Sequence, residues 1–189
     1  MGRKVVLNGG SFGMNSLFTQ LGGSAGKWRY SGWFSRKSSD GYRDNSSSKY
    51  GSENLSLYYD ASEKLKFKWD WSHSNYIIQL AGPLNDSMFF ADPTMATRSR
   101  NYYNPNIHVP SMKVNWELSR TTNFQVISSA VLGVRNSVMF DKPATVNDAI
   151  IDSTLSYANR QVDIDNFNSY TNEIRYLSFF MFCIDSIQR

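Results

Sequence analysis

The sequence predicts an all-β fold in which antiparallel strands run up and down a single sheet. The first observation is the segment from Leu65 to Ser72, where every odd position is apolar and every even position is polar. Because successive side chains of a strand point to opposite faces, this segment forms a strand with one apolar and one polar face. A helix would spread both kinds of residue around its axis. The second observation is that short turns alternate with long loops, which in an up-and-down sheet gathers the long loops at one end.

The composition limits the possible classes of protein. A chain of 189 residues is long enough for one domain, and aromatic residues make up 15% of it. It contains no apolar run of about 18 residues, so no transmembrane helix is predicted. No signal peptide is visible, and the single Cys183 excludes a disulfide framework within the chain. These features indicate either a soluble protein or an incomplete membrane barrel, whose alternating strands give no long apolar run.

The first third of the chain predicts three strands and a polar loop. Alternation is strongest from Lys27, where Trp28 and Tyr30 share one face with Phe34. Glycines and small polar residues separate the segments. The predicted elements are strands over Arg3–Asn8, Phe12–Leu21 and Lys27–Arg36, a tight turn over Gly22–Gly26 and a long polar loop over Lys37–Gly51.

The middle of the chain predicts a hairpin from Ser52 to Ser74, with a polar turn over Asp60–Lys64. The stretch Asn75–Pro110 holds four of the five prolines, which predicts a long loop. The remaining predicted elements are strands over Met112–Leu118, Asn123–Asn136 and Phe167–Tyr176, a short turn over Ser119–Thr122 and a loop over Ser137–Asn166.

The alternation of connection lengths favours a transmembrane barrel. Short turns follow Leu21, Tyr59 and Leu118, and long loops follow Arg36, Ser74 and Asn136. Outer-membrane barrels combine short turns, long outer loops and aromatic residues near the strand ends. Two alternatives stay open at this point. A soluble meander can show the same alternation by chance, and aromatic residues also favour ordinary strands and cores.

Several segments resemble TonB-dependent outer-membrane receptors, and most closely the ferric-citrate type. The resemblance extends from about Val5 to Arg175. It implies a barrel of about 22 strands closed by a plug domain, located in the cell outer membrane. The implied protein is a transporter of an iron chelate and not an enzyme. The segments are Gly10–Gly13, Asp40–Arg43, Asn75–Asp86, Thr97–Tyr103 and Arg135–Val138.

The chain departs from this family pattern. The plug, its energy-coupling motif and the C-terminal assembly strand are not recognisable, so about eight strands of a larger barrel are expected. We therefore expect residues 1–176 to be a partial barrel and residues 177–189, an apolar run without alternation, to be an atypical tail. Such a fragment is not expected to transport by itself. The expected partners are the iron chelate, outer-membrane lipid and, in the full-length protein, the TonB complex.

The predicted ligand site consists of arginines and tyrosines near the loop end. An iron chelate of citrate is anionic, and the guanidinium fork of arginine suits carboxylates. Arg98 and Arg100 stand two residues apart, which in an extended segment puts them on one face. The predicted ligand-binding residues are Arg98, Arg100, Tyr102, Tyr103 and Arg135, with Arg43 and Arg160 as further loop-end arginines. The alternative is that loop arginines pair with lipopolysaccharide or with a carboxylate such as Asp92.

Other chemistry is not predicted. His73 and His108 are two isolated histidines, fewer than a metal site needs. Asp163 and Asp165 lack the glycine and glutamate of a calcium loop. No cofactor, catalytic constellation or nucleic-acid partner is indicated. The competing prediction for the whole chain is a self-contained eight-stranded β-barrel or sandwich that binds a small molecule.

Overall fold

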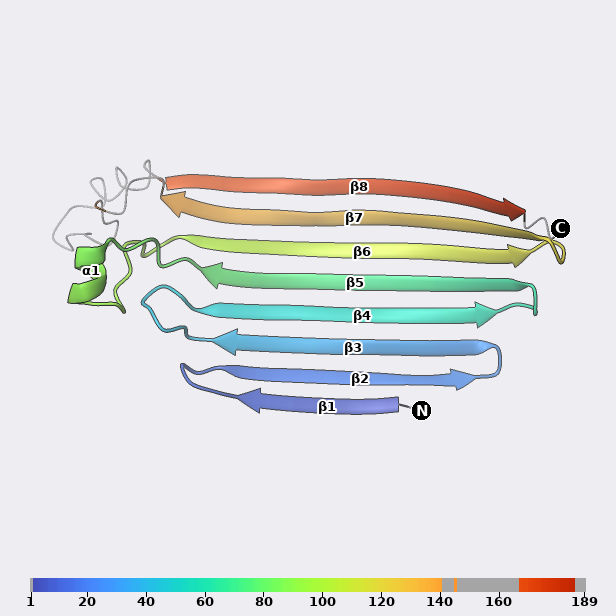
Figure 1. Ribbon diagram of the computed structural model, residues 1–189, viewed down its shortest axis with the longest axis horizontal. Coiled ribbons are helices and arrows are strands. Elements are labelled where there is room, and N and C mark those ends of the chain that lie inside the picture. Colours follow the sequence, from blue (N-terminus) through green and yellow to red (C-terminus); the bar gives the residue numbers. More distant parts are fainter. Residues whose placement is uncertain (1, 141–144, 146–166, 186–189) are drawn as a thin grey trace.

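The structure is a computed structural model that describes residues 2–140, 145 and 167–185. Eight strands form one antiparallel sheet, and each strand pairs with its neighbours in sequence (Figure 1). One short helix, α1 (Asp86–Ala91), lies between β5 and β6. The strands are β1 (Gly2–Gly9), β2 (Asn15–Ala25), β3 (Trp28–Ser39), β4 (Ser48–Asp60), β5 (Leu65–Gln79), β6 (Tyr102–Glu117), β7 (Thr122–Phe140) and β8 (Phe167–Asp185).

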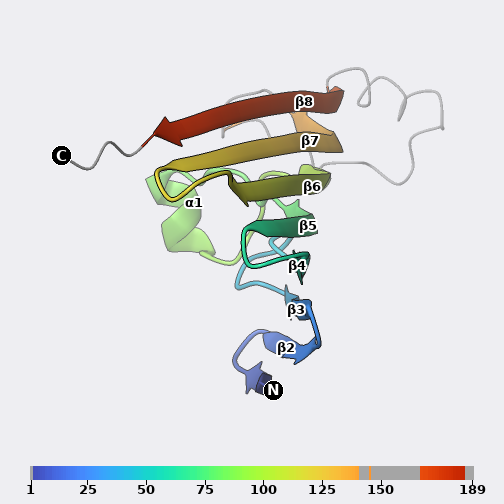
Figure 2. The ribbon, with the colours of Figure 1, turned by 90° about the vertical axis from the view of Figure 1, so that its right-hand side faces the viewer.

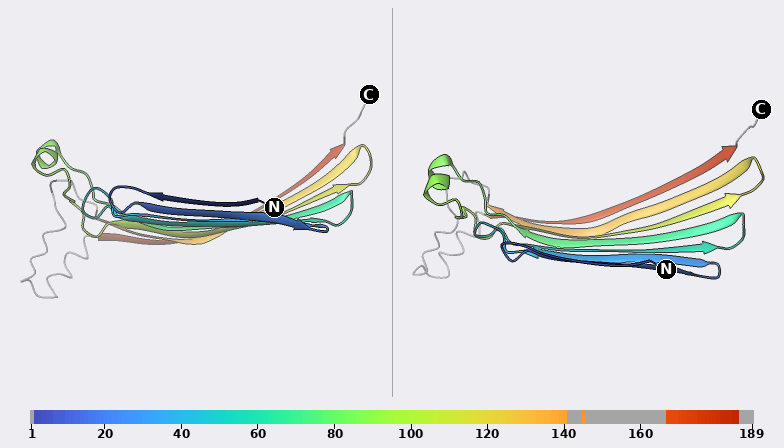
Figure 3. Two further views of the ribbon diagram at one scale, coloured as in Figure 1. Left: turned by 90° about the horizontal axis from the view of Figure 1, so that it is seen from below. Right: turned by 60° about the horizontal axis from the view of Figure 1, so that its bottom comes forward.

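The predicted all-β, antiparallel, up-and-down fold is confirmed. The sheet order runs from β1 to β8 without a crossover. The sheet is open, with β1 and β8 at its two edges (Figure 2). It forms a long, bent layer, and α1 lies beside one end of it (Figure 3). Closure into a transmembrane barrel stays a prediction.

The predicted sorting of connections is also confirmed. The turns at residues 26–27, 61–64 and 118–121 lie at one end of the sheet, which we call the turn end (Figure 1). The connections at 10–14, 40–47, 80–101 and 141–166 begin and end at the opposite end, which we call the loop end. The first of these is short, as the predicted strands Arg3–Asn8 and Phe12–Leu21 imply, so the expectation that every short turn lies at the turn end does not hold for it.

The strands reach further toward the loop end than the sequence predicts. The predicted bounds of the loops Lys37–Gly51 and Asn75–Pro110 are therefore wrong: β3, β4, β5 and β6 extend into them and leave the connections 40–47 and 80–101. β7 likewise continues to Phe140, past the predicted start of a loop at Ser137. Polar residues are poor strand formers alone, but a neighbouring strand supplies hydrogen-bond partners that outweigh this preference. At the other end, β8 runs on through residues 177–185, where the sequence predicts an atypical tail.

Two prolines lie inside β6, where the sequence predicts a loop. Pro105 is fully buried, and Pro110 is paired with Trp71 of β5. Proline has no backbone N–H, so it interrupts a ladder of hydrogen bonds. The β5–β6 ladder skips Tyr76 and Ile77 opposite Pro105, and the β6–β7 ladder skips Val109 and Pro110. β6 accommodates its prolines through these local interruptions.

The glycine-rich turn is shorter than predicted. Gly22 and Gly23 belong to β2 and pair with Ser31 and Tyr30. A Cβ atom at Gly23 would lie 2.8 Å from the Tyr30 hydroxyl, so the tyrosine ring occupies the space a side chain would fill. The chain reverses at Gly26, whose φ of 56° is in the left-handed region that glycine adopts without strain.

The strand register sorts the side chains into two different faces. We call the face that carries Trp69 the apolar face and the opposite one the polar face. Large apolar side chains that are exposed on the strands lie on the apolar face, except for Tyr50 and Met139. Those on the apolar face are Val5, Leu7, Leu21, Trp28, Leu55, Trp71, Ile77, Met112, Trp116, Leu132 and Val134.

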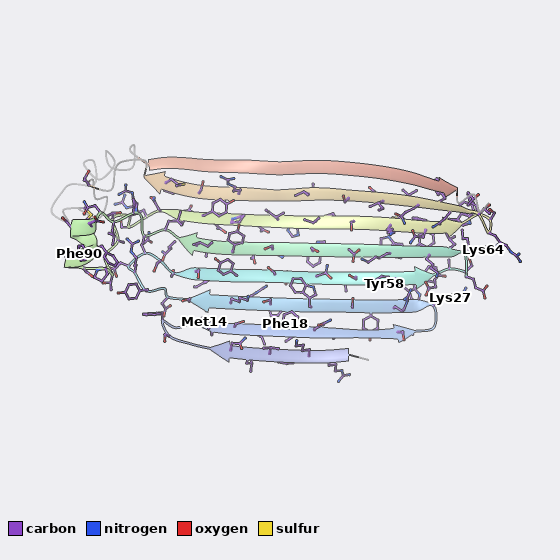
Figure 4. All side chains as sticks on the ribbon, in the orientation of Figure 1. Met14, Phe18, Lys27, Tyr58, Lys64 and Phe90 are labelled. Atoms are coloured by element: carbon purple, nitrogen blue, oxygen red, sulfur yellow. The ribbon has the colours of Figure 1, made fainter. Side chains whose placement is uncertain are left out.

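The polar face carries hydrogen-bonded hydroxyl, amide and charged groups instead. Ser56 donates to Asp70 at 2.5 Å, and Lys68 forms an ion pair with the same carboxylate at 2.7 Å. Arg29 pairs with Asp60 at 3.1 Å nearer the turn end. Side chains lie along the whole length of the described strands (Figure 4). These contacts give the polar and charged groups of this face hydrogen-bond and ion-pair partners within the sheet.

The sheet has no core of its own in the described part of the chain. Ala81 is the buried apolar residue there apart from Pro105, and it belongs to the connection 80–101. The other buried side chains are polar. Ser56 belongs to β4, and the rest lie at or near the loop end: Thr97, Arg98, Asn101 and Ser137. No described helix has the length and apolar character needed to cross a membrane.

Candidate ligand-binding site

Three tyrosines from three strands lie side by side on the polar face near the loop end. Tyr50 on β4 and Tyr76 on β5 are direct cross-strand partners, and their ring centroids are 5.4 Å apart. Tyr103 on β6 continues the series, with its ring centroid 5.8 Å from that of Tyr76. Aromatic pairs at these separations attract each other beyond simple burial. The three rings therefore form a continuous aromatic surface across the sheet.

A cation lies at each end of this aromatic surface. Lys37 of β3 is the cross-strand partner of Tyr50. At the other end, the Arg135 guanidinium carbon of β7 lies 4.9 Å from the centroid of the Tyr103 ring. Both cations are exposed, and neither forms an ion pair with a described residue. We call Lys37, Tyr50, Tyr76, Tyr103 and Arg135 the tyrosine row.

A hollow of about 510 Å³ borders the tyrosine row on the polar face. Phe18, labelled in Figure 4, stacks with Trp33 beside this hollow, and their ring centroids are 6.2 Å apart. Its lining residues are Phe18, Trp33, Ser35, Lys37, Tyr50 and Ser52. Apolar rings beside a few polar and charged groups are typical of small-molecule sites. The arrangement suits a ligand with a flat or apolar part and a negative charge.

Only two of the predicted ligand-binding residues belong to the tyrosine row, namely Tyr103 and Arg135. Tyr102 is in the same strand as Tyr103 and points to the opposite face, because neighbours in a strand alternate. The segment from Arg98 to Arg100 is not extended, since the chain bends at Ser99 and Arg100. The expectation that the two arginines share a strand face is therefore wrong.

Arg98 is part of the packing at the loop end. Its side chain is 2% exposed, and it donates from Nη1 to the carbonyl oxygen of Thr97 at 2.7 Å. Arg100 is half-buried in the same connection. Arg135 is exposed beside the Tyr103 ring, whereas Arg98 is covered by its surroundings. The predicted Arg160, Asp163 and Asp165 lie outside the described residues.

Arg43 joins the two longest described connections. It donates from Nε and Nη2 to the carbonyl oxygen of Met95 at 3.1 and 2.9 Å, and from Nη1 to that of Gly82 at 2.8 Å. Asn45 adds bonds from its amide nitrogen to the carbonyl oxygens of Leu80 and Arg98, at 3.1 and 2.8 Å. These bonds hold the connections 40–47 and 80–101 against each other. Arg43 thus positions the loops, and its donors are occupied.

The two histidines, which are far apart in the sequence and were predicted to be isolated, are neighbours on the apolar face. His73 of β5 pairs with His108 of β6, and their rings stack with centroids 4.2 Å apart. His73 also contacts Glu53 and Asn106, each at 2.7 Å. No group of three or more metal-binding side chains occurs in the described residues. The pair is part of a polar cluster next to Trp71.

Sequence reasoning missed Lys37, Tyr50 and Tyr76 as members of the site. They come from three strands, and only the register of those strands brings them together. All three lie inside segments that the sequence predicts as loops, Lys37–Gly51 and Asn75–Pro110, so no strand face was assigned to them. No protein-family model, no curated protein and no solved structure matches this chain. Its function is therefore argued from the sequence and from the geometry of the sheet.

Proposed function

We propose that this chain is part of a TonB-dependent outer-membrane receptor that takes up an iron chelate such as ferric citrate. One observation carries the membrane part of the proposal. The strands expose an apolar face, and no second layer of described residues covers it. The opposite face is polar and hydrogen-bonded.

Lipid is the partner that fits a face of this kind. Leu55 is 45% exposed and Trp116 is 47% exposed, in the middle and at the turn end of the sheet. Removing apolar surface from water contributes about 25 cal/mol per Å². A bilayer covers such a face, while the polar face borders an aqueous lumen, as in membrane barrels.

Lipid also sets a condition on the edges of the sheet. Each unpaired N–H or C=O group in hydrocarbon costs several kcal/mol, so sheets cross membranes only as closed barrels. β1 and β8 do not pair with each other in the described structure. Further strands between these two edges would complete a larger barrel, in agreement with the expected partial barrel.

Aromatic rings gather at the turn end of the apolar face, as in the girdle of a membrane barrel. The Trp28 ring centroid lies 4.5 Å from that of Tyr59 and 6.3 Å from that of Trp69. Phe67 joins them, 5.7 Å from Trp69. Aromatic rings favour the boundary between hydrocarbon and water, which puts the turn end at one membrane surface.

The receptor part of the proposal depends on the tyrosine row and on the family resemblance. The row lies on the face that borders the lumen, near the end where the long loops gather. Arg135 and Lys37 supply positive charge for an anionic chelate, and arginine binds carboxylates with two parallel hydrogen bonds. Energy coupling through the TonB complex follows from the resemblance alone.

The five tryptophans provide a test of the membrane part. Trp33 is on the polar face, and Trp71 is on the apolar face. We would prepare two variants, each keeping only one of these tryptophans, and add vesicles with brominated acyl chains. The brominated lipid is expected to quench the fluorescence of Trp71 but not that of Trp33. Acrylamide, which stays in the water, is expected to quench Trp33 more than Trp71. Equal quenching of both by acrylamide alone would contradict the proposal.

Binding of ferric citrate tests the receptor part. In detergent micelles, Arg135→Gln is expected to weaken binding about tenfold, the range of one charge-assisted hydrogen bond. Arg29→Gln is the matched control, since Arg29 is on the same face at the turn end. If both variants bind ferric citrate as tightly as the parent chain, the tyrosine row is not the binding site.

The competing function, a self-contained small barrel that binds a small molecule, makes a different prediction. Such a barrel would enclose the apolar face and stay monomeric in buffer without detergent. A soluble, cooperatively unfolding monomer in which neither brominated lipid nor acrylamide reaches Trp71 would favour this second function.

A further inference from the structure

The apolar face changes character toward the loop end. Beyond Trp71 the next cross-strand row contains Glu53, His73 and His108, and the row after that contains Arg36 and Asn75. In β4 and β5 the side chains thus change from Leu55 and Trp71 to charged, imidazole and amide groups, and we call this change the border. Apolar side chains such as Phe34 and Leu132 remain in the same rows on the other strands. If lipid covers the apolar face, this border lies at the depth of the headgroups.

A hollow of about 250 Å³ lies at this border. Its floor is Gly51, which is buried although it has no side chain. A Cβ atom at Gly51 would come within 2.6 Å of Nη1 of Arg36, and the Asn75 side chain is closer still. The Arg36 guanidinium and the Asn75 carboxamide therefore stand directly over the glycine. The hollow is lined by Arg36, Lys49, Tyr50, Gly51, Asn75, Tyr76, Ile77 and Asn104.

The charge in this hollow is positive. Arg36 forms an ion pair with Glu53 at 3.4 Å, and the other oxygen of Glu53 contacts His73 at 2.7 Å. Lys49 is exposed and forms no ion pair with a described residue. Arg36 and His73 thus share the Glu53 carboxylate, and Lys49 adds a second permanent cation to the hollow without a carboxylate partner among the described residues. The excess charge and the amide donor of Asn75 suit an anion with several oxygen acceptors.

We propose that the hollow over Gly51 binds the phosphate of an anionic lipid headgroup. The lipid belongs to the bilayer that covers the apolar face, so this inference depends on the membrane part of the proposed function. Its acyl chains lie along Leu55 and Trp71, and its phosphate reaches Arg36 and Lys49. Basic side chains at the edge of a membrane span bind anionic headgroups in this way.

The experiment compares two lipids on the full chain. Protein in dodecylmaltoside micelles receives equal amounts of phosphatidylglycerol and phosphatidylcholine, and native mass spectrometry measures the ratio of the two lipids retained. The parent chain is expected to retain one phosphatidylglycerol in preference. The double variant Arg36→Gln/Lys49→Gln is expected to lower that ratio about 25-fold, because each of the two cations near an anionic surface contributes roughly a factor of five.

The matched control removes the same charge from the other face. Lys37 is next to Arg36 in β3, and Arg135 is on β7, and both belong to the polar face. Lys37→Gln/Arg135→Gln is expected to keep the preference for phosphatidylglycerol. An equal loss in both double variants would mean that net charge alone selects the lipid, which overturns the inference.

Two further arms separate the possible failures. Inorganic phosphate at millimolar concentration is expected not to displace the lipid, and displacement would show a site for free anions instead. Quenching of Trp71 by brominated lipid reports membrane contact independently of headgroup. Quenching without any preference for phosphatidylglycerol overturns the headgroup site and leaves the membrane proposal intact. Absence of quenching overturns both.

Discussion

The loop end and the strands of this molecule are stabilised by different means. At the loop end, Arg43 and Asn45 bind backbone carbonyl oxygens of a distant connection, and Thr97 and Arg98 are buried. Along the strands, apolar side chains such as Leu55 remain exposed on one face. The loop end carries its own packing, while the strands depend on what covers them. Stability of the strands is therefore a property of the environment as much as of the sequence.

The largest expected effect comes from a charge placed on the apolar face. Leu55→Arg is expected to destabilise the chain by about 2–4 kcal/mol in vesicles, because the guanidinium meets hydrocarbon. Ser31→Arg, on the polar face of β3, is expected to cost little, since Asp70 and water are near. Urea titrations in vesicles, followed by tryptophan fluorescence, compare the two. Equal costs for both variants would remove the distinction between the faces.

A smaller and local effect is expected from the loop end. Arg43→Ala removes three hydrogen bonds to the carbonyl oxygens of Met95 and Gly82 and is expected to cost about 2 kcal/mol. Hydrogen exchange should accelerate in residues 80–101 and stay unchanged in β2. Arg43→Lys, which keeps the charge but not the planar donors, should recover part of the protection. Faster exchange throughout the sheet would contradict the independence of the two regions.

A contact within the polar face is expected to contribute less. Ser56→Ala removes the hydroxyl that donates to Asp70 and is expected to cost about 1 kcal/mol, since Lys68 still pairs with that carboxylate. Ser52→Ala is the control, because its hydroxyl contacts only Ser74, at a longer 3.3 Å. The same urea titration measures both. A cost for Ser52→Ala above that of Ser56→Ala would show that the charged partner is unimportant.

The smallest effect is a pH dependence at the end of α1. The Thr94 hydroxyl and amide donate to Asp92, at 2.6 and 2.8 Å, and the hydroxyl chiefly holds the pKa of Asp92 below its ordinary value. A lowered pKa in the folded state stabilises the turn above the ordinary carboxyl pKa. This contribution is lost as the pH falls through the folded pKa. Thr94→Val should raise the Asp92 pKa toward its ordinary value in an NMR titration. An unchanged pKa would contradict this cause.

The fold was largely predictable from the sequence, because alternation of apolar and polar residues reports directly on the two faces of a strand. The segment Leu65–Ser72 is an example, and the whole of it lies in β5. The strand ends were not predictable in the same way. Tyr102–Pro110 reads as a loop because of its prolines, and only the partners on β5 and β7 make it a strand.

The candidate site was predictable only in part. Tyr103 and Arg135 stood out by residue type, and the structure brings them together. Tyr50 and Tyr76 belong beside them through the register of β4 and β5, which the sequence does not encode in any local pattern. The same limit explains why His73 and His108 seemed isolated. Pairs across strands depend on register, and one residue of slip would put each partner on the wrong face.

The order of the strands in the sheet is their order in the chain, and this has a consequence for how the protein folds. Each ladder joins strands that are consecutive in the chain, so each pairing step closes only the connection between two neighbouring strands. Hairpins closed by the turns at 26–27, 61–64 and 118–121 are the natural first units. Growth from one hairpin to the next would leave a free edge at every stage, with which the next strand in the chain can pair.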